Sequence, residues 1–280
     1  MPGIHVVTDS ACDLTPEMAD RLNVCVVPLT IRFDDEELID REELSSKEFW
    51  DRVVTGPYLP ETAAPAPGAF QQAFLEAAAA GASGVLCVNL SSGLSATCQS
   101  ARTAAESVAD RIPVRVVDSL SVTMGLGLMV MTAVARVGEG ASLDTVADEL
   151  QDLRARTHVY GVVDSLDFLK RGGRIGGAQA LVGSLLSIKP VIDVRQGVVE
   201  VESKQRTRSR ALDYLATKAL EAGRLERLAV VSGVAPDTHE VVSRLVGADC
   251  ANDLVVSELG PVIGAHAGPG TIGVCFQIAR

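Results

Sequence analysis

The sequence predicts an α/β protein of two domains, each with a mainly parallel sheet flanked by helices. The chain has 280 residues, which is enough for two domains of average size. Apolar residues make up 47% of it, so a large core can form. Short apolar runs alternate with amphipathic stretches along the whole chain, a pattern typical of strands and helices in parallel sheets.

In the first half, short apolar runs predict strands, and the stretches between them predict helices. The strands are expected at 4–7, 24–29, 84–90 and 114–117, and the helices at 68–80 and 96–110. Thr15-Pro16 starts another helix, with a capping residue before a first-turn proline. The uncharged run 119–135 is too short to span a membrane, which takes about 20 apolar residues, so it predicts a buried helix end.

The pattern restarts after a helix over 142–156, for which Ser142 is the expected N-cap. We therefore expect domains at 1–155 and 156–280. Further strands are expected at 160–163, 191–194, 198–201, 228–232, 254–259 and 273–278, and helices at 178–186, 208–222 and 238–246. Gln196-Gly197 predicts a hairpin turn, and 263–270 is expected to be a glycine-rich loop.

Charge and composition exclude several function classes. There are 25 basic and 36 acidic side chains, giving a net charge of −11, and aromatic residues are only 4%, so nucleic-acid binding is not expected. The six cysteines form no zinc-ligand pattern and, with no secretory signal in the first residues, indicate reduced thiols in a cytoplasmic protein. The GxGxxG match at 268–273 precedes a strand instead of a helix, so no dinucleotide, and no other cofactor or metal, is expected.

Three residues are candidates for a binding site, each beside a plainer structural alternative. Ser95 lies in 91–97 (SSGLSAT), where Thr97 replaces the second glycine of the hydrolase elbow, so a helix cap with anion-binding amides is more plausible. Thr62 lies in a stiff extended loop before Pro65, for which a simple connector is favoured. His266 lies among small residues that let a ligand approach, although a lone histidine is more often structural.

Seven basic residues gather at 170–174 and 204–210 of this acidic chain. Arg206, Arg208 and Arg210 alternate, so in an extended conformation they would share one face, and with Arg174 they would form one patch. Such a patch could dock a phosphate or an acidic partner, or it could be an ordinary solvated face.

Seven segments in this order resemble the DegV family of bacterial fatty-acid-binding proteins. They are TDSACDL at 8–14, TAAP at 62–65, SSGLSAT at 91–97, VVDS at 116–119, FLKRGGRI at 168–175, GSLLSIKP at 183–190 and IGAHAGPG at 263–270. The resemblance implies two α/β domains that hold a long-chain acyl group between or within them. It also implies that Thr62 and Ser95 bind the carboxylate and that His266 lies near it. Some family members present the bound acid to a partner kinase, which phosphorylates the carboxylate, so such a partner is expected here.

One departure from the family pattern affects this site. The family loop usually reads Thr-Ser-Gln-Pro, whereas Ala63 and Ala64 follow Thr62 here, so contacts from the usual Ser or Gln are missing. The sequence thus predicts a non-catalytic cytoplasmic fatty-acid carrier without an integral membrane segment. The alternative is a serine acyl hydrolase that uses Ser95 and His266 with Asp9 or Asp118 as the acid.

Overall fold

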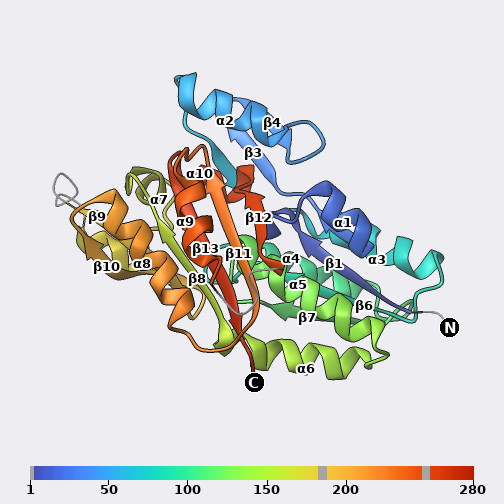
Figure 1. Cartoon of the computed structure of the whole chain (residues 1–280). Helices are drawn as coiled ribbons and strands as arrows, with labels where there is room; N and C mark the ends of the chain where they lie inside the picture. The colour runs from blue at the N-terminus through green and yellow to red at the C-terminus, as the bar shows by residue number, and fades with distance from the viewer. Residues whose placement is uncertain (1–2, 182–187, 248–252) are drawn as a thin grey trace.

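The computed structural model describes residues 3–181, 188–247 and 253–280 and contains three sheets (Figure 1). The first sheet is parallel, with the strand order β2-β1-β6-β7. Its strands are β1 (Ile4–Asp9), β2 (Val24–Val27), β6 (Gly84–Asn89) and β7 (Val114–Asp118). All four were expected, which confirms the α/β reading of the first half.

Helices cover both faces of this sheet. They are α1 (Pro16–Leu22), α3 (Pro67–Ala79), α4 (Thr97–Ser107), α5 (Thr123–Gly138) and α6 (Leu143–Leu153). Adjacent residues of β1 point to opposite faces, so Val7 packs in the cluster with α3 and α4, whereas Val6 packs in the cluster with α5 and α6. The predicted caps are confirmed, since Thr15 and Ser142 each accept a hydrogen bond from the backbone N–H three residues ahead.

A small antiparallel sheet, which the sequence did not predict, is inserted between β2 and α3. Its order is β4-β3-β5, and with the helix α2 it projects at the top of the view in Figure 1. The elements are β3 (Thr30–Phe33), β4 (Glu36–Ile39), α2 (Ser46–Thr55) and β5 (Glu61–Ala63). The insertion is anchored by Trp50, which is buried and donates a hydrogen bond from Nε1 to the carbonyl of Leu259 at 3.1 Å.

The third sheet has six strands in the order β10-β9-β8-β13-β11-β12. They are β8 (Thr157–Val162), β9 (Lys189–Arg195), β10 (Val198–Gln205), β11 (Leu225–Gly233), β12 (Val255–Glu258) and β13 (Thr271–Ile278). One face packs against α8 (Arg208–Leu220) and α9 (Thr238–Leu245), and the other faces α5. The remaining described helical segments are α7 (Asp167–Arg171), α10 (Pro261–Ala267) and the 3-10 turns η1 (Ser10–Cys12), η2 (Arg154–Arg156) and η3 (Gly176–Leu181).

The expectation of a second mainly parallel sheet is wrong. Only the β11–β12 pair is parallel among the described strands, and every other pair in this sheet is antiparallel. The alternation of strands and helices identifies the elements but not which strands become neighbours. The parallel pair β11 and β12 is joined through α9, which packs on the sheet. The hairpin is confirmed, because Gln196 and Gly197 both have positive φ between paired β9 and β10.

The helix expected at 178–186 is also revised. The chain forms η3 as far as residue 181, and the rest of that helix, with most of the motif at 183–190, lies outside the described residues. We propose to keep the domain division at 1–155 and 156–280. It is supported by strand order, since every strand of the first sheet precedes it and every strand of the six-stranded sheet follows it. One apolar cluster nevertheless includes both Val6 and Cys275, so the two parts share a core.

Candidate functional site

A mainly apolar cavity lies between the six-stranded sheet and segments of the first half of the chain. It comprises about 850 Å³ of space between its wall atoms, part of which is open to solvent. Its apolar walls come from both halves of the chain: Leu29, Leu90, Leu94, Val122, Val159, Val163, Leu169, Ile192, Val194, Val199, Val231, Leu259, Val262, Ile263 and Ala267. Thr62, Ser95, Arg174 and His266 also line it, so all three predicted carboxylate-binding residues belong to one cavity.

Thr62 is held in place by the inserted sheet. It lies in β5, where it pairs with Ile31 of β3, and Pro65 follows, which favours an extended backbone before it. The segment is therefore extended, as expected, but it is a sheet strand that presents Thr62 to the cavity. The sequence favoured a simple connector here, whereas the segment is a paired strand whose Thr62 lines the cavity.

His266 lies in the helix α10, so the expectation of a glycine-rich loop over 263–270 is wrong for its first part. Gly264 is required by packing, because a Cβ there would lie 2.7 Å from the ring of Phe49. The helix ends at Gly268, whose φ of 77° suits a residue without a side chain. Small residues thus let α10 approach its neighbours closely, and His266 occupies the last turn.

Thr62 and His266 are joined by a hydrogen bond of 2.9 Å between Oγ1 and Nε2. Burial, together with the positive charge of Arg174, lowers the pKa of His266 to about 4, so the ring is neutral at physiological pH. Its buried Nδ1 has no partner among the described residues. An unpaired N–H is rarer in proteins than an unpaired acceptor, so we assign the proton to Nε2, which donates it to Thr62. The hydroxyl proton of Thr62 then remains available to a ligand.

Gly172 was not singled out from the sequence, yet the position of His266 depends on it. A Cβ at residue 172 would lie 2.2 Å from Nδ1 of His266. The α7 segment that precedes Gly172 packs against α10, so a side chain here would displace the ring. The glycine pair before Arg174 was the signal that the sequence offered for this close approach.

Ser95 lies just before α4, and its expected role as the helix cap is only approximate. The N-cap is Ala96, without a side-chain cap bond, because the helix begins at Thr97. Ser95 Oγ accepts a hydrogen bond from the backbone N–H of Thr97 at 3.3 Å and lies 2.9 Å from the Thr97 hydroxyl. The side chain is half-buried in the cavity wall, next to the start of the helix.

Arg174 belongs to the cavity. Its Nε donates to the carbonyl of Leu94 at 3.0 Å, and Nη1 donates to the carbonyl of Gly172 at 2.6 Å. These bonds tie the segment after α7 to the strand-to-helix loop that carries Ser95. They place a positive charge beside a neutral histidine and two hydroxyl groups, an arrangement suited to an anion.

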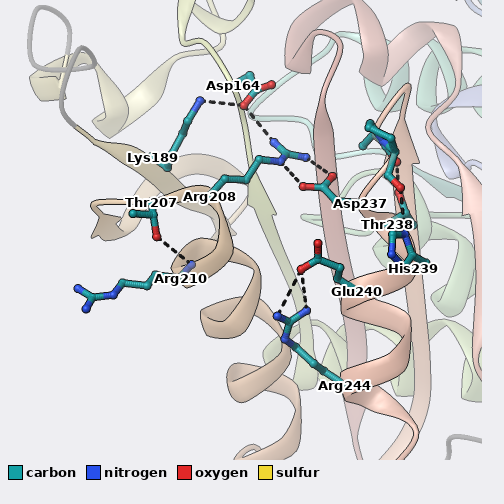
Figure 2. Close-up of polar contacts among 12 residues, drawn as sticks. Asp164, Lys189, Thr207, Arg208, Arg210, Asp237, Thr238, His239, Glu240 and Arg244 are labelled. Atoms are coloured by element: carbon teal, nitrogen blue, oxygen red, sulfur yellow. Dashed lines mark hydrogen bonds and ion pairs between the residues drawn. The ribbon is translucent and has the colours of Figure 1, made fainter.

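The proposed face of alternating arginines does not form as expected. β10 ends at Gln205, and Arg208 and Arg210 lie in the first turn of α8, where Thr207 caps the N–H of Arg210. Arg208 is committed to ion pairs, with bonds to Asp237 (Nη2–Oδ1, 2.8 Å) and Asp164 (Nη1–Oδ1, 3.0 Å) (Figure 2). Arg206 and Arg210 are exposed, and Figure 2 shows the Arg210 side chain pointing away from this network.

The geometry does not assemble the hydrolase triad. His266 hydrogen-bonds to Thr62, Ser95 hydrogen-bonds to Thr97, and the carboxylates considered as the acid are bonded to other groups. Asp9 accepts bonds from Ala11, Asn89 and Leu90. Asp118 accepts bonds from Ser92 and Leu120. Among the described residues, neither a base bonded to Ser95 nor an acid bonded to His266 is present, so the expected Ser–His–acid arrangement is not formed.

The polar end of the cavity adjoins a surface hollow. Thr62, Arg174 and His266 line both, and the hollow continues over Phe168 and Arg171 of α7. Within the described residues, no His, Cys, Asp and Glu side chains gather into a possible metal site. No helix in the described ranges is both long enough and apolar enough to cross a membrane.

Fold and site together define an α/β protein with a mainly apolar cavity against its six-stranded sheet, into which Thr62, Ser95, Arg174 and His266 bring polar groups. The sequence pattern of the DegV family, described as uncharacterised proteins, matches residues 3–279, and this chain belongs to that family. A DegV domain-containing protein of Deinococcus radiodurans is 38% identical over 280 residues, which is 98% of each chain.

Solved structures of similar proteins are described as fatty-acid binders. A fatty-acid-binding DegV family protein from Thermus thermophilus is 36% identical and superposes with a TM-score of 0.90, covering 99% of this chain and 100% of that one. A stearic acid-binding protein from Eubacterium ventriosum is 26% identical, with a TM-score of 0.88 over 99% of this chain and 98% of that one.

Proposed function

We propose that this protein binds a long-chain fatty acid non-covalently, with the acyl chain in the cavity and the carboxylate beside Thr62, Ser95 and His266. The observation that carries the proposal is the cavity itself, whose mainly apolar walls include the hydrogen-bonded pair Thr62 and His266 together with Arg174. The descriptions of the Thermus and Eubacterium relatives support the same ligand class.

The two ends of the ligand would contribute differently to binding. Each buried methylene contributes about 0.8 kcal/mol, so the chain supplies most of the affinity. A carboxylate loses its hydration on entry, and that loss must be offset by hydrogen bonds and a positive charge. Thr62 can donate a hydroxyl proton, and Arg174 supplies the charge that the neutral His266 does not.

We further propose that the bound acid is presented to a partner acyl kinase. The surface hollow over α7 shares Thr62, Arg174 and His266 with the cavity. A protein that docks over α7 could therefore reach the carboxylate of the bound acid. Arg206 and Arg210 are exposed at the start of α8 and could contact an acidic partner or its phosphate. Arg208 contributes indirectly, because its bond to Asp164 links this part of α8 to the loop before α7.

The proposed compartment is the cytoplasm. The five described cysteines are all free thiols, the state that a reducing compartment maintains.

Denaturing extraction of the purified protein, followed by mass spectrometry, tests the ligand. We expect a long-chain fatty acid in the extract, and delipidated protein should rebind stearic acid in a calorimeter. The absence of lipid from repeated extractions, together with no heat of binding for added acids, would refute the proposal.

The kinase step has its own test. Double charge reversal at Arg206 and Arg210 should leave fatty-acid binding intact and reduce phosphorylation of the bound acid by an acyl kinase with ATP. If phosphorylation is unchanged, these two residues form an ordinary solvated face.

A further inference from the structure

Strand β8 presents one glycine, Gly161, to the acyl cavity. Val159 and Val163, two residues before and after it, line the same cavity. Tyr160 and Val162 pack in the cluster on the opposite face, beneath α8, although Tyr160 also borders the cavity. A side chain at position 161 would therefore point into the cavity, beside Ile192, its partner on β9, which also lines the cavity.

Neither packing nor backbone conformation explains why this residue is a glycine. A Cβ at Gly161 would meet its nearest neighbours at ordinary contact distances, 3.7 Å to Ile192 Cγ1 and 3.8 Å to the carbonyl of Ile272. Its φ is not among the positive values in the described chain. Glycine inside a strand costs conformational entropy and gives no side-chain packing, so its presence here needs another reason.

The neighbouring glycine provides a contrast. Gly273 of β13 pairs directly with Gly161 and also lines the cavity. A Cβ there would lie only 2.8 Å from Cγ2 of Val231, so packing against β11 is sufficient to explain Gly273. Gly161 alone of this pair leaves a recess of about methyl size in the cavity wall that no protein atom fills.

We propose that Gly161 is a specificity-determining residue, which sets the width of the cavity so that acyl-chain atoms occupy the recess above it. This inference rests on the proposed fatty-acid binding and extends it, because it names the wall position that selects among acyl chains. A side chain at 161 would compete with the ligand for space while leaving the protein fold undisturbed.

The test compares Gly161→Ala and Gly161→Val with the wild type, using a ladder of saturated acids from decanoic to octadecanoic. Gly138→Ala is the matched control, because Gly138 is exposed at the end of α5, does not line the cavity, and has open space around its Cβ position. The thermal transition of each variant is measured alongside, and we expect it to stay at or above the wild-type value.

We expect Gly161→Ala to weaken binding of the longer acids by about 5- to 150-fold, the range for overpacking a filled site, and to spare the shortest acids. Gly161→Val should weaken the binding of shorter acids as well, and Gly138→Ala should bind all of the acids like the wild type. Equal affinities in Gly161→Ala and the wild type, or an equal loss at every chain length, would overturn the inference. Failure of the wild type to bind any acid would instead refute the proposed function.

Discussion

Replacing Thr62 by valine removes one hydroxyl group and little else. Valine has nearly the same shape and also favours a strand, so β5 should keep its pairing with β3. The change deletes the hydrogen bond of 2.9 Å to His266 Nε2 and the donor that we assign to the ligand carboxylate. A hydrogen bond to a charged group contributes about 1.5–3 kcal/mol, so affinity for stearic acid should fall roughly 10- to 150-fold.

The same substitution should also lower the free energy of unfolding without ligand. His266 would lose the partner of Nε2 while Nδ1 is already unpaired, and an unsatisfied buried donor costs about 1–3 kcal/mol. Urea unfolding of the delipidated protein measures this loss, and displacement of a fluorescent fatty acid measures the change in affinity.

Two control variants distinguish the loss of the Thr62 hydroxyl group from other consequences of the substitution. Thr62→Ser keeps the donor and should bind within a few-fold of the wild type. Thr55→Val deletes an exposed hydroxyl that bonds only to the Asp51 carbonyl in α2, at 2.7 Å, and should change neither measurement appreciably. If Thr62→Val binds stearic acid as tightly as Thr62→Ser does, the assignment of Thr62 to the carboxylate is refuted.

Three further predictions concern Ser95, the buried Asp13 at the end of η1, and Arg208. Ser95→Ala should weaken fatty-acid binding by roughly 10- to 150-fold in the displacement assay, and an unchanged affinity would exclude Ser95 from the head-group site. Burial raises the pKa of Asp13 to about 7, so the folded state holds a proton that the unfolded state releases, and stability falls as the pH rises from the ordinary aspartate value to neutrality. Asp13 accepts hydrogen bonds from the Thr123 hydroxyl and the Gly260 N–H, and asparagine cannot accept both in the same way. The stability of Asp13→Asn relative to the wild type should therefore rise as the pH increases from mildly acidic to mildly alkaline; a pH-independent difference in urea unfolding would contradict this. Arg208→Met should lose about 1–3 kcal/mol of stability because it breaks the bonds to Asp237 and Asp164, whereas Arg210→Glu should melt like the wild type, and equal melting of both variants would contradict the structural role of Arg208.

The parts of the fold that the sequence could predict are those fixed by local chemistry. Buried strands such as β6 are continuous apolar runs, helix caps such as Thr15 are single residues, and Gln196-Gly197 is a two-residue turn. Strand direction in the six-stranded sheet depends on which strands become neighbours, a property of long-range packing that periodicity does not encode. The inserted sheet was missed because its strands are short and partly charged, although Ile31 and Phe33 do alternate as buried residues.

The site residues likewise fall into those that the sequence could predict and those that it could not. Thr62, Ser95 and His266 lie far apart in the sequence, and the resemblance to the DegV family brought them together where spacing could not. Alternation of arginines predicts a shared face only for an extended chain, and the helix that the sequence predicts at 208–222 already conflicts with it, as α8 with its N-cap Thr207 confirms.

A crystal structure of the protein with bound stearic acid tests the central claim most directly. We expect one carboxylate oxygen within hydrogen-bonding distance of Thr62 Oγ1, on the Arg174 and Ser95 side of the cavity, with the acyl chain running past Gly161. A carboxylate at the opposite end of the cavity, or a ligand bound outside it, would contradict the account.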